Sequence, residues 1–428
     1  MPNPHRVVII GGGFGGLAVA RSLKRAPVEV TLIDRCNYHL FQPLLYQVAT
    51  GVLSPANIAG PLRHILKNQR NTRVLLAEAT HIDAANRRVI LSDGAIEYDS
   101  LIVATGATHQ YFGHAEWEQF APGLKTIEDA TDMRGRILLA FEAAERESDP
   151  EKRRAWMTFV IVGAGPTGAE LAGALGEIAN DTLRHDFREI NTSEARIILV
   201  EGTGRVLPTY PESLSASARK MLERLGVTIR TNCMVTSVSE GRVTIREGDR
   251  TEQICARTIL WAAGVLASPL SRGLETEAGA KLDRAGRVIV EPDLTVADHP
   301  EIFVIGDLAN FSHQTGQPLP GVAQPAIQEG RYVGKLIQRR LRGERSEPFH
   351  YWDKGNLATL GRAAAVADLH GLRLSGWPAW MIWLFVHLLY IVEFQNRLLI
   401  LLQWAWLYIN YDRSARLITG GNPLPLDL

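Results

Sequence analysis

The feature that most restricts the fold of this chain is a pattern that occurs twice. An apolar run leads into closely spaced glycines and then into a helix of small residues, first in RVVIIGGGFGGLAVARSLKR (6–25) and again in TFVIVGAGPTGAELAGALGEIA (158–179). In the GxGxxG spacing, the first glycine permits a tight turn, the second lets the backbone approach a pyrophosphate, and the third lets the helix pack on the strand. The sequence therefore predicts two dinucleotide-binding folds. The glycines in this spacing are Gly11, Gly13, Gly16, Gly163, Gly165 and Gly168.

An acidic residue ends the next apolar strand in both halves. The strand VEVTLID ends at Asp34, and ARIILVEG reaches Glu201 after a longer helical insertion. An acid at this point, about twenty residues past the glycines in the usual case, accepts a hydrogen bond from an adenosine ribose 2′-hydroxyl. Because a carboxylate repels a 2′-phosphate, Glu201 favours NADH over NADPH, although the nearby Arg205 keeps NADPH open.

Each half then continues through an antiparallel excursion to a buried strand and a turn of small residues. These turns are Ala104-Thr105-Gly106 and Ala262-Ala263-Gly264, and a later strand in HPEIFVIGDLANF ends at Gly306-Asp307. The late strand would close the first fold, with the second fold inserted into it. A simple turn with an aspartate helix cap is the other interpretation of Gly306-Asp307.

The predicted fold class is α/β, with two Rossmann-like dinucleotide-binding domains and a C-terminal helical segment. The first domain is discontinuous. Its two parts are predicted at residues 1–112 and 280–345, the inserted domain at 113–279, and the C-terminal region at 346–428.

Composition disfavours several functional classes. Lys plus Arg and Asp plus Glu both number 46, so no basic surplus suggests a nucleic-acid partner. Cys36, Cys233 and Cys255 lie far apart without a CxxC, which argues against a disulfide framework, a zinc site and a dithiol redox centre. We expect no metal site. The opening MPNPHRVVIIGGG leaves no room for a signal or transit peptide, so we expect a cytoplasmic protein.

The order of elements resembles that of the flavoproteins with two dinucleotide-binding domains. The resemblance implies one non-covalent FAD in the N-terminal fold, NADH as hydride donor in the inserted fold, and a contact between Gly306-Asp307 and the ribityl-phosphate part of the flavin. Disulfide reductases of this group need a redox cysteine pair, and sulfide:quinone oxidoreductases need cysteines that flank the flavin. Cys36 has no such partner in the sequence, so neither subgroup is favoured.

Longer motifs resemble those of the type II NADH dehydrogenases, which are single-subunit NADH:quinone oxidoreductases. The stretch NYHLFQPLLYQVATGVLSP (37–55) resembles the signature H-x-F-x-P-L-L-Y-x-V-A-T-G, and GVAQPAIQEG (321–330) resembles the quinone-site motif A-Q-x-A-x-Q-x-G. VGAGPTGAELAG (162–173), LWAAGV (260–265) and the apolar C-terminal segment resemble further parts of the family. The resemblance implies hydride transfer from NADH to FAD N5, then two-electron reduction of a membrane quinone to quinol without proton pumping. Ubiquinone and menaquinone are both compatible with it.

The resemblance assigns candidate residues to three sites. The FAD candidates are Gly11, Gly13, Phe14, Gly15, Gly16, Asp34, Arg35, His39, Pro43, Leu44, Ala79, Ala104, Thr105, Gly106, Gly306, Asp307, Ala323 and Gln324. The NADH candidates are Gly163, Gly165, Pro166, Thr167, Gly168, Glu170, Glu201, Ala263 and Gly264. The quinone candidates are Ala323, Gln324, Ala326, Ile327 and Gln328.

Three of these residues are candidate catalytic residues. Gln324 and Gln328 are four residues apart, so they share one face of a helix starting near Pro325, and their amides can donate to or accept from a quinone or the flavin ring. Capping and packing of the helix is the alternative. Glu170 is a helix-N-terminal acid that the macrodipole favours. The resemblance implies instead that it faces the nicotinamide–flavin contact, where it would orient NADH or handle a proton.

The C-terminal stretch 375–411 is strongly apolar. Two twelve-residue runs, 381–392 and 398–409, flank the polar EFQNR. A helix of that length spans roughly 18 Å, short of the roughly 30 Å hydrocarbon core of a bilayer. A single joined helix would bury Glu393 and Arg397 at a cost of several kcal/mol.

We therefore expect two short helices that lie in one leaflet as a monotopic anchor. Pro378 suits a first helical turn, and Arg413 and Arg416 could meet anionic headgroups. A buried core hairpin and a dimer interface are alternatives, and the family resemblance implies a homodimer. Tryptophans that suit the membrane interface are Trp377, Trp380, Trp383, Trp404 and Trp406.

These features place the expected enzyme on the cytoplasmic face of a prokaryotic inner membrane, bound to lipid and quinone through 375–411. The alternative enzymes are a soluble NADH oxidase and another NAD(P)H-dependent flavin reductase, such as a disulfide reductase or a sulfide:quinone-type enzyme. A redox-sensing or partner-binding flavoprotein is a third class. The missing cysteine pair and the apolar tail disfavour the alternative enzymes, and the full set of motifs disfavours the third class.

Overall fold

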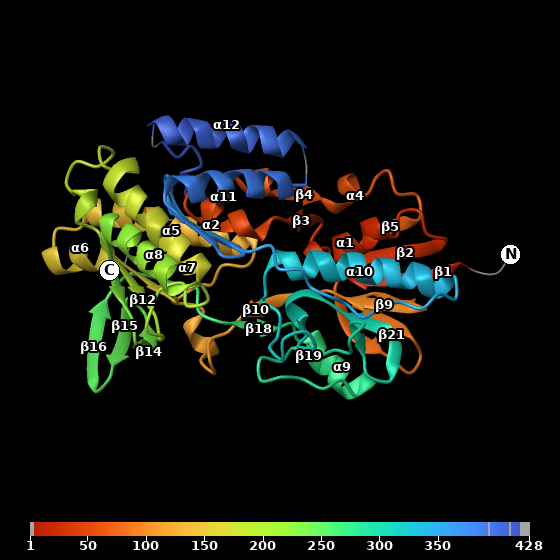
Figure 1. The fold of residues 1–428 in the computed structure, drawn as a ribbon. Helices are drawn as coiled ribbons and strands as arrows, with labels where there is room; N and C mark the ends of the chain where they lie inside the picture. The colour runs from red at the N-terminus through yellow and green to blue at the C-terminus, as the bar shows by residue number, and fades with distance from the viewer. Residues whose placement is uncertain (1–3, 393, 411, 420–428) are drawn as a thin grey trace. The chain divides into compact units, whose positions relative to one another are not determined.

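The computed structural model describes residues 4–392, 394–410 and 412–419. Packing groups the chain into two compact units, whose segments can be followed by colour in Figure 1. The first unit comprises Met1–Leu40, Ala59–Thr108 and Val265–Asp353, and the second comprises Phe41–Ile58, His109–Gly264 and Lys354–Leu428. The insertion Phe41–Ile58 therefore packs with the C-terminal region. The predicted domain boundaries describe ligand-binding domains rather than packing units, and they stay a prediction.

A six-stranded sheet forms the core of the first unit. Its order is β20 (Thr295–Val296), β21 (His299–Val304), β9 (Ser100–Val103), β1 (His5–Ile10), β2 (Val28–Asp34) and β5 (Thr72–Leu76). β1 runs parallel to β2 and β9, and β21 runs parallel to β9, so the late strand joins the first sheet as predicted. Residues 7–10 of β1 are buried, as expected for a parallel strand covered on both faces.

Two helices of the first unit pack unusually closely. They are α1 (Phe14–Ser22), which follows the first glycine-rich turn, and α10 (Ala323–Leu341). A Cβ at Gly330 would overlap the carbonyl oxygen of Gly15, and a Cβ at Gly334 would press on Ser22. Glycine at both positions therefore lets α10 approach α1.

The remaining elements of the first unit are short. The predicted antiparallel excursion is confirmed as a three-stranded sheet of β6 (Ala79–Asp83), β7 (Arg88–Leu91) and β8 (Gly94–Glu97). The others are β3 (Tyr38–Leu40), β4 (Ala59–Pro61), α4 (Leu62–Ile65), β10 (Ala107–His109), β18 (Val265–Ala267), α9 (Leu270–Ala278), β19 (Val288–Ile289), η5 (Gly306–Leu308) and β22 (Ala309–Asn310).

The second unit contains the second Rossmann-like sheet. Four parallel strands lie in the order β13 (Val227–Arg230), β12 (Arg196–Val200), β11 (Thr158–Val162) and β17 (Thr258–Trp261). α7 (Pro166–Glu177) follows the glycine-rich turn after β11. The second antiparallel excursion is also confirmed, as β14 (Cys233–Ser239), β15 (Arg242–Glu247) and β16 (Arg250–Cys255). The predicted pair of dinucleotide-binding folds is confirmed.

Further helices complete this part of the second unit. α5 (Ile127–Arg146) begins with a capping box, in which Thr126 and Asp129 satisfy each other's backbone N–H groups. The others are η1 (Gln42–Leu44), α2 (Leu45–Ala49), α3 (Pro55–Ile58), η2 (Ala115–Trp117), α6 (Pro150–Trp156), the π-helix η3 (Ile178–Thr182), η4 (Thr192–Glu194) and α8 (Glu212–Arg224).

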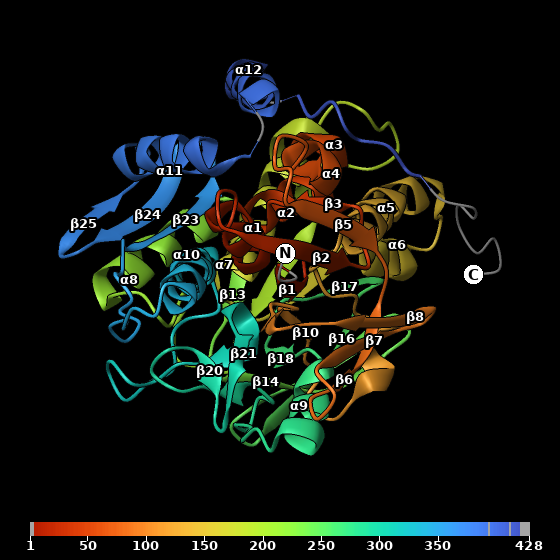
Figure 2. The same ribbon diagram turned by 90° about the vertical axis from the view of Figure 1, so that its right-hand side faces the viewer.

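The C-terminal region opens with a sheet that was not predicted. β23 (Asn356–Gly361), β24 (Ala364–Leu369) and β25 (Leu372–Ser375) pair antiparallel, with tight turns at Ala363 and His370, which both have positive φ. Figure 2 shows α11 (Trp377–Tyr390) on one face of this sheet and α8 on the other, and both helices contact its strands.

The two predicted C-terminal helices are present as α11 and α12 (Phe394–Asn410). Pro378 lies in the first turn of α11, as predicted. α12 begins earlier than its apolar run, because Asn396 donates to the carbonyl of Ala56 at 3.2 Å and Arg397 donates to that of Ile391 at 2.7 Å. Glu393 lies outside the described residues. Among the residues that are described, no helix combines the length and the apolar character needed to cross a membrane.

Candidate active site

The first glycine-rich turn has the geometry of a phosphate cradle. Gly11 has a φ of +103°, and a Cβ there would overlap the carbonyl of Ala104. A Cβ at Gly16 would overlap the carbonyl oxygen of Gly11, whereas one at Gly13 would meet nothing within 4 Å. No side chain caps the N-terminus of α1, so its backbone N–H groups remain available to an anion.

The second glycine-rich turn repeats this geometry. Gly163 has a φ of +96°, a Cβ at Gly168 would overlap the carbonyl oxygen of Gly163, and one at Gly165 would meet nothing within 4 Å. Pro166 is in the first turn of α7 and no side chain caps that helix. Each turn therefore has the space and the backbone donors that a dinucleotide pyrophosphate needs.

The two strand-ending acids occupy equivalent places. Asp34 accepts hydrogen bonds from the backbone N–H groups of Gly12 and Cys36. Glu201 accepts from the backbone N–H groups of Ala164 at 2.7 Å and Thr203 at 2.8 Å. Burial raises the pKa of Asp34 above its ordinary value. A carboxylate has about four acceptor positions, so both acids can still accept from a ribose hydroxyl.

Other FAD candidates in the first unit gather around its glycine-rich turn. The ring of His39 is buried, bonds the carbonyl of Gly12 through Nδ1 at 2.9 Å, and meets Phe14 edge-on. Burial lowers the pKa of His39 to about 4, so the ring is neutral at physiological pH. The Thr105 hydroxyl is buried without a partner among the described residues, as expected for a group that bonds an absent ligand.

The remaining FAD candidates are divided between the units. Arg35 is exposed and Ala79 is half-buried at the start of β6, both in the first unit. Pro43 and Leu44 belong to the second unit, where Leu44 is fully buried. Among the NADH candidates, Thr167 is half-buried in the first turn of α7, while Ala263 and Gly264 follow β17.

Gly306 and Asp307 follow β21 and meet α10. Gly306 has a φ of +72°, and its N–H donates to the carboxyl of Glu329. Glu329 is 2% exposed, and burial raises its pKa to about 8. The prediction did not include Glu329, although the sequence signal was an acidic residue just before Gly330 in the quinone-site motif.

The quinone-site motif forms the first turns of α10. Ala323, Gln324 and Ile327 are half-buried and Ala326 is buried. Both polar atoms of the Gln328 amide bond the backbone of Trp352: Nε2 donates to its carbonyl at 2.9 Å and Oε1 accepts from its N–H at 3.0 Å. Gln328 therefore holds a backbone segment of the first unit.

Glu170 of α7 lines a pocket that lies entirely within the second unit. Part of the pocket is open to solvent, and aromatic side chains from α11 and α12 form one wall. Burial raises the pKa of Glu170 well above its ordinary value, although a backbone hydrogen bond from Thr359 opposes the shift. The carboxyl therefore keeps its proton at pH values where an exposed glutamate has lost it. The aromatic lining residues are Tyr46, Trp380, Trp383, Trp404 and Tyr408.

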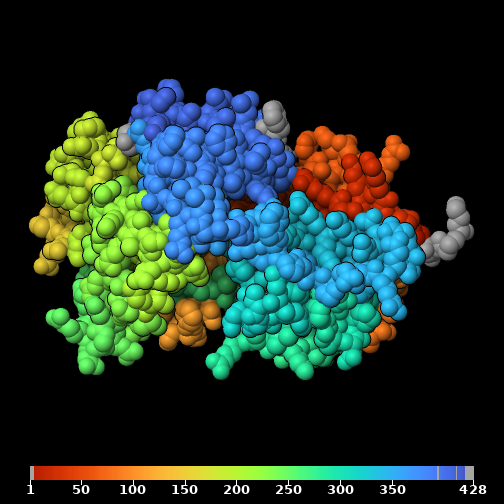
Figure 3. Space-filling view, in the orientation of Figure 1, coloured from red at the N-terminus to blue at the C-terminus, as the bar shows by residue number. Residues whose placement is uncertain are grey.

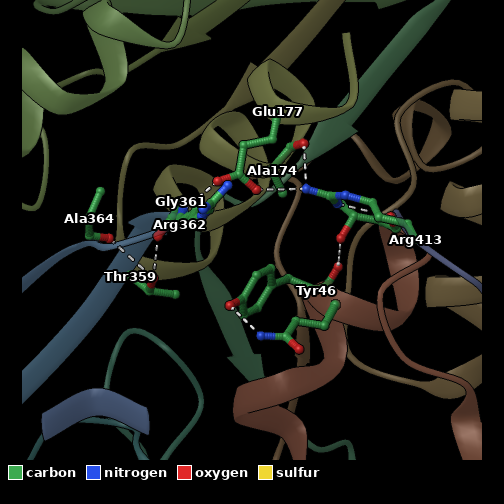
Figure 4. Close-up of polar contacts among 10 residues, drawn as sticks. Tyr46, Ala174, Glu177, Thr359, Gly361, Arg362, Ala364 and Arg413 are labelled. Atoms are coloured by element: carbon green, nitrogen blue, oxygen red, sulfur yellow. Dashed lines mark hydrogen bonds and ion pairs between the residues drawn. The ribbon is translucent and has the colours of Figure 1, made fainter. Parts of the chain in front are cut away.

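A buried ion pair joins the segments around this pocket. The Arg413 side chain is 1% exposed and donates to Glu177 at 2.8 Å, and it also donates to the carbonyls of Thr50 at 3.0 Å and Ala174 at 3.2 Å. Glu177 in turn accepts from the backbone N–H of Arg362. Figure 4 shows how these contacts tie α7 to the segment after α2, the turn after β23 and the tail after α12.

The prediction that Arg413 could meet anionic headgroups is wrong. Arg413 cannot reach a lipid surface because it is enclosed by protein and paired with Glu177. Arg416 is also paired, with Asp186 and with Asp412 at 3.2 Å. Nothing in the local sequence marks Arg413 as buried, because its partners are more than two hundred residues away along the chain.

The prediction for the tail tryptophans is wrong for two of the five. Trp383 and Trp404 are 2% and 5% exposed, and their ring centroids are 5.2 Å apart. Trp380 is half-buried and packs on Tyr408 at 5.3 Å. Only Trp377 and Trp406 are more than half exposed, at 54% and 60%. The helices therefore turn one aromatic face inward to the pocket.

Neither a metal nor a disulfide site is found in the described part of the chain. No group of three or more His, Cys, Asp or Glu side chains there could hold a metal ion. Cys36, Cys233 and Cys255 form no disulfide.

Two family models match consecutive parts of the chain. The model described as pyridine nucleotide-disulphide oxidoreductase matches residues 5–330, and the model described as NDH2 C-terminal domain matches residues 353–409. The solved structure of NDH2 from Plasmodium falciparum in complex with NADH is similar, with a TM-score of 0.88 at 20% identity over 98% of this chain and 100% of that chain. That likeness shows the fold alone.

Two curated relatives are similar along nearly their whole length. The type II NADH:quinone oxidoreductase Ndh of Mycobacterium tuberculosis is 47% identical over 426 residues, which are 98% of this chain and 91% of that protein. The type II NADH:quinone oxidoreductase NdhA of the same organism is 48% identical over 427 residues, 97% of this chain and 90% of that protein. Together with the two matching family models, this identity shows that the chain belongs to the type II NADH:quinone oxidoreductases and is an FAD-dependent enzyme that oxidises NADH.

Proposed function

We propose that the two glycine-rich turns divide the nucleotides, with FAD at the turn before α1 and NADH at the turn before α7. When bound, FAD accepts a hydride from NADH at N5 and delivers two electrons to a quinone. The unpartnered Thr105 hydroxyl and the enclosed His39 ring in the first unit support a bound group there. Glu201, held by two backbone N–H groups, supports NADH rather than NADPH at the second turn.

The quinone ring binds in the pocket of the second unit. The observation that carries this proposal is the combination of an aromatic wall from α11 and α12 with a few polar groups, among them Glu170. Flat aromatic side chains suit a quinone ring, and a small number of placed polar groups fixes its orientation. The match to the NDH2 C-terminal domain spans residues 353–409 and so includes both helices, and neither a soluble NADH oxidase nor a sulfide:quinone-type enzyme is favoured.

Glu170 holds a proton at the quinone pocket. Reduction of a quinone to a quinol consumes two protons, and a carboxyl with a raised pKa can carry one of them at neutral pH. Replenishment from water through the open side of the pocket would return Glu170 to its protonated form.

The quinone-site motif has a divided role. Gln324, in the first turn of α10 with Ala323, Ala326 and Ile327 nearby, contacts the flavin through its amide. Gln328 acts instead as a positioning residue, because both atoms of its amide are bonded to the Trp352 backbone.

The outer faces of α11 and α12 attach the enzyme to one leaflet of a membrane. Figure 3 shows the atoms of this segment, in blue, gathered in one continuous area. Exposed apolar side chains there form a surface that lipid would cover, and a second copy of the chain could cover part of it in a homodimer. We propose the cytoplasmic face of a prokaryotic inner membrane as the location. The most exposed apolar residues are Trp377, Phe385, Leu389, Leu402, Trp406 and Ile409.

The test of this function is an anaerobic experiment on the purified, FAD-loaded protein. NADH should bleach the flavin absorbance, and a short-chain quinone should then restore it. Recovery with oxygen but not with quinone would contradict the proposal and would favour an NADH oxidase.

A further inference from the structure

Three buried side chains connect the tail helix to the quinone pocket. Tyr46 and Gln47 lie on α2, and Trp404 lies on α12. The Trp404 indole Nε1 donates to the Gln47 side-chain Oε1 at 2.8 Å, and Gln47 Nε2 donates to the Tyr46 hydroxyl at 2.9 Å. All three residues line the pocket and are less than a tenth exposed.

The direction of these hydrogen bonds is fixed by Trp404. An indole N–H can only donate, so the Gln47 amide must turn its oxygen toward Trp404 and its NH₂ group toward Tyr46. The phenol oxygen of Tyr46 then accepts, and its own hydrogen must be donated elsewhere. Among the described residues, no acceptor receives that hydrogen. The Tyr46 hydroxyl is therefore a buried donor at the pocket wall that a ligand with an acceptor atom would satisfy.

We propose that the Tyr46 phenol donates this hydrogen to a carbonyl oxygen of the quinone, and that Trp404 makes the donation possible by orienting the Gln47 amide. The inference rests on the proposed function, in which this pocket holds the quinone. A quinone carbonyl is an acceptor only, so it matches a phenol whose lone pair is already engaged. Tyr46 is then a substrate-binding residue and Trp404 a positioning residue that acts through Gln47.

The surroundings of Tyr46 keep the phenol in its donating form. Burial, with a smaller contribution from the nearby Glu170, raises the pKa of Tyr46 well above its ordinary value. The hydroxyl therefore stays protonated throughout the physiological range. Trp383 also lines the pocket, and its indole N–H has no hydrogen-bond partner among the described residues.

The hydrogen-bonded relay of Trp404, Gln47 and Tyr46 also lets α12 affect the chemistry of the pocket. Without the indole N–H, the Gln47 amide is free to flip and present its oxygen to Tyr46. The phenol would then donate to Gln47 rather than to the quinone. The position of α12 therefore determines whether the Tyr46 hydroxyl donates to the quinone or to Gln47.

The test uses flavin reoxidation by a short-chain quinone in the full-length, FAD-loaded enzyme after anaerobic reduction by NADH. Tyr46→Phe should lower the second-order rate of reoxidation about tenfold, and Trp404→Phe about threefold to fivefold, the range expected for one lost hydrogen bond. The double variant should be no slower than Tyr46→Phe alone, because Trp404 acts only through Tyr46. Flavin reduction by NADH and FAD content should stay unchanged in all variants.

The matched control is Tyr332→Phe, which removes a phenol that bonds the carbonyl of Glu347 in the other unit. It should leave reoxidation unchanged. Reoxidation of Tyr46→Phe at the wild-type rate would overturn the inference, and so would a double variant whose loss is the product of the two single losses, since that would make Trp404 a packing residue. Failure of quinone to reoxidise the wild-type flavin would overturn the proposed function as well.

Discussion

At the scale of single residues, four carboxyl groups have different tasks because their surroundings differ. Asp34 and Glu201 each accept two backbone hydrogen bonds at the end of a strand, the place from which we propose that each accepts from a ribose hydroxyl. Glu329 is buried and Glu170 is half-buried at the pocket wall, and burial raises the pKa of both carboxyls. Burial raises the pKa of Asp34 as well, so the two backbone hydrogen bonds that each acid of the first pair accepts distinguish that pair from the second.

Glu201→Ala should narrow the preference for NADH over NADPH. The ratio of kcat/KM for the two nucleotides should fall about tenfold or more, because a charge-assisted hydrogen bond to the ribose and a repulsion against the 2′-phosphate are both lost. The ratio is the informative quantity, since loss of the bond to Ala164 affects both nucleotides alike. Glu212→Ala, at an exposed acid in the first turn of α8, is the control. An unchanged ratio in Glu201→Ala would remove Glu201 from this role.

Glu329 should make the free energy of unfolding depend on pH. Its pKa is raised from 4.5 to about 8 in the folded protein, so the folded state binds the proton more tightly than the unfolded state. This contribution is complete below about pH 4.5 and is lost as the pH rises to about 8. Wild type should therefore lose more stability between pH 5 and pH 8 than Glu329→Gln, by about a few kcal/mol.

The measurement is denaturant unfolding of both proteins across that range at a fixed FAD concentration. The control is Glu118→Gln, which changes an exposed acid, and its free energy of unfolding should change with pH as that of wild type does. Parallel pH curves for wild type and Glu329→Gln would show that the buried carboxyl does not titrate as described.

At the scale of elements, α11 and α12 serve two surfaces. Inward, they supply Trp383 and Trp404 to the pocket, and outward they expose large apolar side chains. The sequence predicted both helices from their apolar runs and their polar interruption. It could not tell which tryptophans face inward, because the helices are apolar on nearly every side and their sequence does not mark a buried face.

The glycine-rich turns and the two Rossmann-like sheets were predictable for the opposite reason. Each rests on local requirements, such as the positive φ of Gly11 and Gly163 and the close approach at Gly16 and Gly168. The prediction missed the sheet β23–β25, whose strands are short and joined by tight turns. Its strands follow α10 of the first fold, and the repeated pattern that guided the prediction has no counterpart for them.

The double variant Leu402→Glu with Ile409→Lys should release the protein from membranes. Both side chains are strongly exposed on α12, at 59% and 71%, and neither lines the pocket. Placing charges there opposes burial in the apolar part of a leaflet. The measurement is co-sedimentation with phospholipid vesicles, with Leu372→Glu on β25 as the control. Sedimentation equal to that of wild type would contradict the anchor.

At the scale of the whole molecule, the pocket proposed for the quinone is a product of long-range packing. It joins α2, α7, the turn after β23, both C-terminal helices and Arg413, which are spread over more than three hundred residues of the chain. The sequence motifs predicted Glu170 at the nicotinamide–flavin contact and the quinone at residues 323–328, none of which lines this pocket. Motif spacing carries no information on which distant aromatic residues meet Glu170. Tyr46, Gln47 and Trp404 could be recognised as a relay only from their distances.

The most direct test of this account is to fill the pocket and follow the two half-reactions separately. Leu407 is half-buried and lines the pocket, so Leu407→Trp should obstruct it. After anaerobic reduction by NADH at the wild-type rate, flavin reoxidation by a short-chain quinone should be at least about tenfold slower, while Leu372→Trp should match wild type in both steps. Reoxidation of Leu407→Trp at the wild-type rate, or equal slowing of both half-reactions, would contradict the assignment of this pocket to the quinone.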